Sequence, residues 1–167
     1  YRGRVTSQIP RALYLRLGTP EDQVTADLDA ALAYLLSRPD VDPGRVASLG
    51  FCFGGGHSLL LSLRHPETIP LTIVYYGDVI GDPATLAPLA NSRGVLGIFG
   101  ENDQQIPVAE VAAFEQALNT LGIPNEVTIY PGVGHAFLNA ENYDQAGPAG
   151  EAWQQTLDFL AQNLNAQ

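Results

Sequence analysis

The sequence predicts an α/β fold in which a mostly parallel sheet lies between layers of helices. One observation favours this class, and a second bounds the number of domains. Apolar runs of strand length alternate along the chain with longer segments of helical period, a pattern typical of parallel sheets joined by helical crossovers. The chain has 167 residues, of which 46% are hydrophobic and 16% charged, so it can bury one substantial core but is short for two domains. We therefore expect a single domain over residues 1–167.

The first predicted helix begins around Thr19 and Pro20, a capping residue followed by one that suits the first helical position. Acidic residues directly after them favour the positive end of the helix dipole. Apolar residues at helical spacing predict one buried face, before Pro39 ends the pattern: Val24, Leu28, Ala31, Leu32 and Leu35. We expect this helix to pack on a sheet. The first 18 residues show no sustained period, and their structure stays open.

Strands and helices alternate along the rest of the chain. After a turn at residues 42–44, the expected strands are apolar runs at residues 45–49, 71–76, 95–99 and 126–130. The expected helices are segments at residues 55–64, 108–121 and 151–164. No internal repeat and no linker divides this series, which therefore predicts one parallel sheet.

A glycine-rich turn joins the first predicted strand to the helix that follows it. The turn reads Gly-Phe-Cys-Phe-Gly-Gly over residues 50–55 and has the form G-x-C-x-G-G. A sharp strand-to-helix turn exposes its central residue and crowds the neighbours, so glycines suit the flanking positions. The helix start supplies N–H groups and a positive dipole end that stabilise a thiolate and an oxyanion. Cys52 is therefore the candidate nucleophile; the alternative is a small buried hydrophobic residue in a tight turn.

A thiol nucleophile needs a base, and His135 is the best placed of three histidines. It follows the last predicted strand in a loop at residues 131–137, from which a side chain can reach over the C-terminal edge of the sheet. His57 falls inside a predicted helix and His65 at the end of it, so neither needs a catalytic role. No histidine pair has common zinc spacing, and we expect neither a metal nor another cofactor.

The carboxylate that would orient the histidine lies after the strand at residues 95–99. Glu101 and Asp103 are alternatives. Asp103 is favoured because it lies deeper in the loop and has the shorter side chain, whereas Glu101 is accounted for as a solvated charge. The resulting order of nucleophile, acid and histidine is the order found in α/β-hydrolases.

These motifs resemble those of the dienelactone hydrolases, a family of α/β-hydrolases with a cysteine nucleophile. Residues 50–55 are similar to the nucleophile turn of the family, residues 100–107 to its acid loop and residues 134–137 to its histidine loop. The tail, with Tyr143, Trp153 and residues 157–160, resembles its closing helix. The resemblance covers almost the whole chain and implies an α/β-hydrolase-like three-layer sandwich.

The N-terminal strands of such a domain are expected to be missing. Tyr1-Arg2-Gly3 is similar to a segment that follows several earlier strands in the family, and the sequence contains no methionine. We therefore expect the chain to be the C-terminal two thirds of a dienelactone hydrolase-like domain. The strand at residues 45–49 would then lie at an uncovered edge of the sheet, and a chain restored at its N-terminus would turn over esters faster.

The resemblance implies a reaction as well as a fold. Cys52 would attack the carbonyl of a small ester or lactone, as in a carboxymethylenebutenolidase. His135 would exchange protons as the acyl-enzyme forms and breaks down, and Asp103 would orient His135. The backbone N–H of Phe53 is expected to be one oxyanion donor.

Three residues are candidates for contact with the substrate. Family members that act on dienelactone bind its carboxylate with arginines, one of which lies four residues after the histidine. Asn139 has this position here, which argues against dienelactone itself as the substrate. Arg2 and Arg4 are candidates for the other arginine, and ordinary solvated arginines are the alternative.

Composition excludes several other functions. The chain has 18 acidic and eight basic residues and a formal net charge of -10, which disfavours nucleic acids and anionic membranes as partners. All eight basic residues are arginine, so no lysine can form a Schiff base or bind phosphate in a P-loop. A single cysteine and the lack of a long apolar run favour a cytoplasmic protein. The resemblance implies a small-molecule ester or lactone as its partner.

The competing function is a non-catalytic α/β-hydrolase scaffold used for binding or regulation, because the fold alone does not establish activity. Hydrolysis of larger acyl or peptide substrates is a third reading of the same motifs. The sequence leaves the oligomeric state open.

Overall fold

The computed structural model describes residues 18–164 of the chain. The chain divides into two compact units, Tyr1–Val41 and Asp42–Gln167. The expectation of a single domain over residues 1–167 stays a prediction. Arg2 and Arg4, which were candidates for substrate contact, lie outside the described residues.

The first unit contains the helix α2 (Glu21–Leu36). It begins one residue later than predicted, because the backbone of Pro20 is extended and Pro20 is the N-cap. The buried face of this helix is also narrower than the predicted one. Val24 and Leu32 are buried, whereas Leu35 is exposed. The packing of this helix on a sheet stays a prediction.

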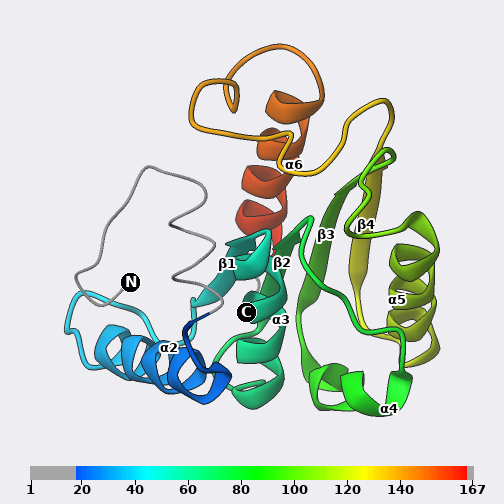
Figure 1. The fold of residues 1–167 in the computed structure, drawn as a ribbon. Coiled ribbons are helices and arrows are strands. Elements are labelled where there is room, and N and C mark those ends of the chain that lie inside the picture. The colour runs from blue at the N-terminus through cyan, green and yellow to red at the C-terminus, as the bar shows by residue number, and fades with distance from the viewer. Residues whose placement is uncertain (1–17, 165–167) are drawn as a thin grey trace. The chain divides into compact units, whose positions relative to one another are not determined.

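The second unit is built on a four-stranded sheet. Its strands are β1 (Ala47–Phe51), β2 (Leu71–Tyr75), β3 (Gly94–Gly100) and β4 (Asn125–Tyr130). They follow one another across the sheet in chain order (Figure 1), and every neighbouring pair is parallel. The prediction of a parallel sheet is confirmed.

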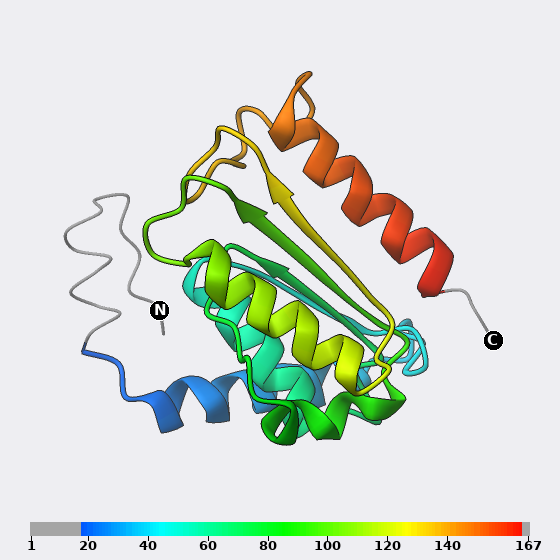
Figure 2. The ribbon, with the colours of Figure 1, turned by 90° about the vertical axis from the view of Figure 1, so that its right-hand side faces the viewer.

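Helices cover the sheet on both faces. They are α3 (Phe53–Arg64), α4 (Pro83–Leu86), the 3-10 helix η1 (Ala87–Asn91), α5 (Val108–Thr120) and α6 (Pro148–Asn163). Figure 2 shows α6 on one face of the sheet and α3 and α5 on the other, so the unit has the three layers that the sequence predicted. In the described part of the chain, no helix has both the length and the apolar character to cross a membrane.

Two apolar clusters form the core, one on each face of the sheet. Phe99, Phe114 and Leu118 belong to the cluster beneath α5, and Tyr75 and Phe159 to the cluster beneath α6. Both faces of the central strands are therefore covered, and β2 and β3 are buried at every position. Strands buried on both faces have continuous apolar sequences, which is why the predicted bounds of β2 and β3 are close to the observed ones.

The strand β1 lies at an edge of the sheet in the described part of the chain. It runs two residues further than predicted, because residues 50 and 51 continue the ladder opposite Val74 and Tyr75. Two of its apolar side chains are less well covered than those of the central strands. Leu49 is 39% exposed and Phe51 is 37% exposed.

Three buried serines fix α3 against the sheet directly behind the glycine-rich turn at residues 50–55. The Ser58 hydroxyl donates to the Ile73 carbonyl oxygen at 2.9 Å, and the Ser48 and Ser62 hydroxyl oxygens are 2.8 Å apart. Buried hydroxyls that find partners in this way add a directional constraint to apolar packing. The start of α3 is therefore held at a defined position relative to β1 and β2.

Candidate active site

Cys52 lies between β1 and α3, where the backbone takes an unusual conformation. Its φ is 55° and its ψ is -123°, values that an L-residue adopts only at a cost of about 1–3 kcal/mol. Three hydrogen bonds hold this turn. The Cys52 N–H donates to the Tyr75 carbonyl oxygen at 2.9 Å, and the Cys52 carbonyl oxygen accepts from the N–H groups of Gly55 and Gly56 at 2.8 and 3.3 Å. A strained strand-to-helix turn of this kind exposes its central side chain at the C-terminal edge of the sheet.

Close backbone approach explains two of the glycines in the turn. A Cβ atom on Gly50 would lie 1.8 Å from the Gly54 carbonyl oxygen, and one on Gly55 would lie 2.8 Å from the Tyr75 carbonyl oxygen. Gly54 differs from our expectation. A Cβ atom there would meet no other heavy atom of the described chain within 4 Å, so no close approach requires a glycine at this position.

Asp103 lies in the loop after β3, and its two carboxylate oxygens have different partners. Its Oδ1 accepts from the N–H groups of Gln105 and Ile106, at 2.8 and 3.2 Å. Its Oδ2 lies 2.8 Å from Nδ1 of His135, and the Asp103 side chain is fully buried. The loop therefore fixes both the position and the orientation of the carboxylate.

His135 lies between the carboxylate and the thiol, in the loop after β4. Its Nε2 is 3.1 Å from Cys52 Sγ, and its Nδ1 faces Asp103 on the opposite side of the ring. The imidazole is 17% exposed, so one edge of the group reaches solvent. The three side chains come from the C-terminal ends of β1, β3 and β4, which meet at one edge of the parallel sheet.

Backbone bonds hold the acid loop and the histidine loop together. The Glu101 N–H donates to the Tyr130 carbonyl oxygen and the Asn102 N–H to the Val133 carbonyl oxygen, both at 2.9 Å. The Glu101 side chain joins this contact, since its Oε2 accepts from the Gly132 N–H at 2.9 Å. Glu101, the alternative acid of the sequence analysis, therefore binds the backbone of the histidine loop, whereas Asp103 faces the imidazole.

Tyr76 supports the histidine from the end of β2. Its ring lies edge-on to the His135 ring at 5.3 Å between centroids, and its hydroxyl donates to the Leu138 carbonyl oxygen at 2.9 Å. Burial, together with the neighbouring Cys52, raises the pKa of Tyr76 to about 12. The sequence analysis did not select Tyr76, although its place at the end of a predicted strand, level with Cys52, was a usable signal.

The other histidines lie in or beside α3. His57 is buried and packs edge-on against Phe53, with 4.1 Å between ring centroids. His65 is the C-cap of the helix. Phe53 is the first residue of α3 and directly follows Cys52, and its role as an oxyanion donor stays a prediction. Among the residues that the structure describes, no group of three or more His, Cys, Asp or Glu side chains could hold a metal ion.

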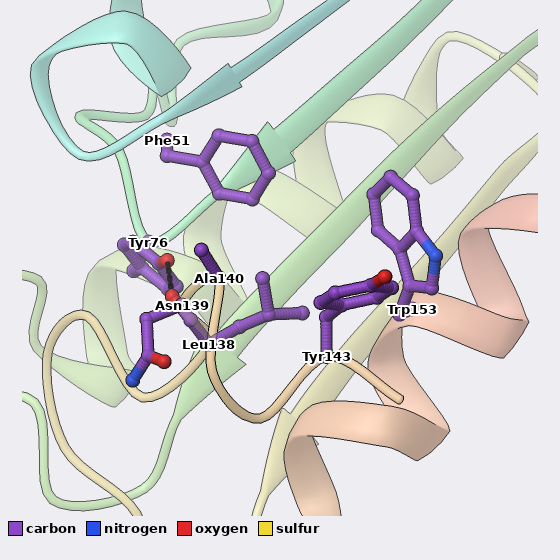
Figure 3. Close-up of a pocket in the computed structure, with 7 residues that line it drawn as sticks. All are labelled: Phe51, Tyr76, Leu138, Asn139, Ala140, Tyr143 and Trp153. Atoms are coloured by element: carbon purple, nitrogen blue, oxygen red, sulfur yellow. Dashed lines mark hydrogen bonds between the residues drawn. The ribbon is translucent and has the colours of Figure 1, made fainter. Parts of the chain in front are cut away.

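An apolar cavity of about 420 Å³ adjoins this cluster (Figure 3). Phe51 lines it from the end of β1, Trp153 from α6 and Tyr76 from the end of β2. The loop between β4 and α6 supplies the rest of the described lining: Leu138, Asn139, Ala140 and Tyr143. Asn139, a predicted substrate contact, thus lies at the cavity, and its Oδ1 accepts from the Glu141 N–H at 2.8 Å.

Comparison with known proteins places this arrangement in a family. Residues 1–164 match the sequence model of the "Dienelactone hydrolase family". The chain is 32% identical over 151 residues to a protein of Methylorubrum extorquens named "Putative carboxymethylenebutenolidase", and 34% identical over 154 residues to one of the same name from Salmonella typhimurium. Each match covers 86% of this chain but only 52% and 55% of the relative. The chain therefore spans about half the length of these relatives.

A solved structure agrees with these matches. The crystal structure described as "Putative Dienelactone Hydrolase" from Klebsiella pneumoniae is 29% identical in sequence and superimposes with a TM-score of 0.71. The superposition covers 94% of this chain and 68% of the Klebsiella chain. A family model that matches nearly the whole sequence and a shared α/β architecture lead to the same conclusion: the chain belongs to the dienelactone hydrolase family.

Proposed function

We propose that this chain carries the catalytic triad of a carboxylic ester hydrolase that cleaves small esters or lactones through an acyl-enzyme on Cys52. The observation that carries the proposal is the continuous contact from thiol to imidazole to carboxylate, at 3.1 and 2.8 Å. A nucleophile within reach of a base, with the base oriented by a third group, is the arrangement that covalent catalysis requires. The names of the relatives favour a lactone or another small ester as the substrate.

The first half of the reaction transfers the acyl group to the enzyme. His135 Nε2 takes the proton of the Cys52 thiol, and the thiolate sulfur forms a bond to the carbonyl carbon. The carbonyl oxygen becomes an oxyanion, for which the N–H of Phe53 at the start of α3 is the proposed donor. The protonated Nε2 then gives its proton to the leaving oxygen as the carbon–oxygen bond breaks and the carbonyl re-forms. This leaves a thioester on Cys52; the alcohol departs from an open-chain ester and stays attached to the acyl group of a lactone.

The second half regenerates the enzyme. His135 removes a proton from water, and the hydroxide oxygen attacks the thioester carbon. The carbon–sulfur bond then breaks, the carboxylic acid leaves, and the sulfur recovers its proton from Nε2. Throughout, Asp103 keeps the proton of His135 on Nδ1, so that Nε2 is free to accept and return protons on the side of the sulfur.

Turnover of para-nitrophenyl acetate and of a small unsubstituted lactone tests this proposal. The full chain is expected to hydrolyse at least one of them, and iodoacetamide is expected to alkylate Cys52 and abolish turnover. Cys52→Ala is expected to lose turnover by about 10³-fold or more. Full activity in Cys52→Ala would contradict the proposal. If iodoacetamide alkylates Cys52 but neither ester is cleaved, the result would favour the competing reading of a non-catalytic binding scaffold.

A further inference from the structure

We propose that the cavity beside Cys52 selects uncharged esters by binding the apolar portion of the substrate. This inference rests on the proposed function, because it names the class of ester that the triad would receive. Three properties of the cavity support it: two lining residues that adjoin Cys52 and His135, the absence of charge among the described lining residues, and the size of the cavity.

Two lining residues of the cavity adjoin the proposed reaction centre. Phe51 in its wall is the residue before Cys52, and Tyr76 contacts the ring of His135 from the same wall. Phe51 and Tyr76 also face each other, with 6.2 Å between ring centroids. A group bound in the cavity is therefore held next to a carbonyl placed on the sulfur, which is the positioning that raises the rate of an attack by Cys52.

The described lining of the cavity offers no charge to a carboxylate. None of its seven residues is an acid or a base that ionises near neutral pH. Two of its polar groups already have partners within the protein, since the Tyr76 hydroxyl donates to the Leu138 carbonyl oxygen and the Asn139 Oδ1 accepts from the Glu141 N–H. A carboxylate that entered here would lose hydration without gaining a cation from these seven residues, which is strongly unfavourable.

The aromatic wall of the cavity and the net charge of the chain both favour uncharged substrates. Tyr143 and Trp153 meet edge-on at 6.0 Å between ring centroids and present apolar ring surface to the cavity (Figure 3). A volume of about 420 Å³ lies in the range of small-molecule sites and accommodates a short aliphatic chain or one aromatic ring. The net charge of -10 also repels anionic substrates at long range.

Two matched pairs of esters test the selection of uncharged groups. Methyl hexanoate and monomethyl adipate differ by a carboxylate at the far end of the acyl chain. Hexyl acetate and ω-acetoxyhexanoate differ by a carboxylate at the far end of the alcohol. Hydrolysis by the full chain is followed by proton release. We expect kcat/KM to be at least about tenfold higher for the uncharged ester in the pair whose varied end enters the cavity.

A charge placed in the cavity wall provides the complementary variant. Tyr143→Asp is expected to lower kcat/KM for the favoured uncharged ester by about tenfold, with a smaller change for methyl acetate, which is too short to fill the cavity. Leu157→Asp is the matched control, because Leu157 is comparably exposed on α6 but lies outside the described lining. The control is expected to retain both the activity and the selectivity.

Binding without turnover separates this inference from the proposed function. Trp153 is the single tryptophan of the chain, so the intrinsic tryptophan emission reports on the cavity. In Cys52→Ala, the favoured uncharged ester is expected to change this emission saturably, at concentrations at least about tenfold lower than its charged partner requires.

If methyl acetate is hydrolysed but neither pair shows a preference in turnover or binding, the inference is wrong and the proposed function stands. If no ester is cleaved but the uncharged esters still bind selectively, the proposed function is wrong and the selectivity of the cavity stands.

Discussion

At the scale of single residues, the two carboxylate oxygens of Asp103 face different partners, one the backbone of its own loop and the other the His135 ring. Oδ1 is engaged by two backbone N–H groups, so only Oδ2 faces the imidazole. Asp103→Asn is expected to keep the bonds to the loop but to present an amide N–H to Nδ1, which moves the imidazole proton to Nε2, the wrong side of the ring for a base. We expect kcat for para-nitrophenyl acetate to fall by about 10²–10⁴-fold.

Glu101→Gln is the matched control for Asp103→Asn. The glutamine side chain would retain an oxygen that can accept from the Gly132 N–H, so the histidine loop keeps its support. We expect kcat to change by less than about threefold. A larger loss in Glu101→Gln than in Asp103→Asn would assign the orienting carboxylate to Glu101.

The three histidines give a second comparison at this scale. His135→Ala removes the proposed proton carrier and is expected to lower kcat by about 10³-fold or more. His65→Ala removes a histidine that caps α3 and is expected to retain nearly full turnover. Equal losses in the two variants would show that the effect is on folding, and retained turnover in His135→Ala would remove His135 from the mechanism.

At the scale of elements, the turn from β1 to α3 depends on particular glycines. Gly50→Ala would place a methyl group 1.8 Å from the Gly54 carbonyl oxygen, so the turn must move or break. We expect a loss of about 2–4 kcal/mol in the free energy of unfolding, together with loss of turnover. Urea denaturation followed by tryptophan emission measures the first effect.

Gly54→Ala is the neighbouring control. The methyl group has open space there, and alanine is favoured over glycine by up to about 1 kcal/mol inside a helix. The variant is expected to be as stable as the parent or slightly more stable. A Gly54→Ala variant as damaged as Gly50→Ala would contradict the assigned close approach.

The elements were predictable from sequence to different degrees. β2 and β3 were located closely because strands covered on both faces are apolar throughout. β1 was displaced by two residues, because its last two positions are part of the glycine-rich turn motif and carry no strand pattern of their own. The short α4 was not predicted, although Asp82 followed by Pro83 is a helix-start signal and the Asp82 side chain accepts from the N–H groups of Ala84 and Thr85.

The residues of the site were also predictable from sequence to different degrees. Cys52, Asp103 and His135 could be selected because each follows a predicted strand in a short motif that contains glycine. The cavity could not be predicted, since it combines Phe51, Tyr76 and Trp153 from three separate elements with a loop that has no periodic pattern. Long-range packing of this kind leaves no local signal in a single sequence.

At the scale of the whole molecule, buried tyrosines are expected to lower the free energy of unfolding as the pH becomes alkaline. Burial raises the pKa of Tyr75, Tyr76 and Tyr130 above the ordinary value of 10, to about 12 for Tyr76. The folded state therefore keeps these protons at a pH where the unfolded state loses them. Their contribution is fully present below pH 10 and is lost as the pH rises through the folded pKa values.

We accordingly expect the free energy of unfolding to fall as the pH rises from 10 to 12, and this loss is expected to be smaller in Tyr76→Phe. Urea denaturation across this range measures the stability, and phenolate absorbance follows the ionisation. A stability that stays constant across the range would contradict the burial of these hydroxyls.

The central claim is that Cys52 becomes acylated, and trapping the acyl-enzyme tests it most directly. The full chain is mixed with para-nitrophenyl acetate, quenched in acid within the first turnover and digested for mass spectrometry. We predict one added acetyl group on the peptide that contains Cys52, in an amount that matches the burst of nitrophenol, and no such adduct in Cys52→Ala. An acetyl group on another residue, or a nitrophenol burst that persists in Cys52→Ala, would contradict the claim.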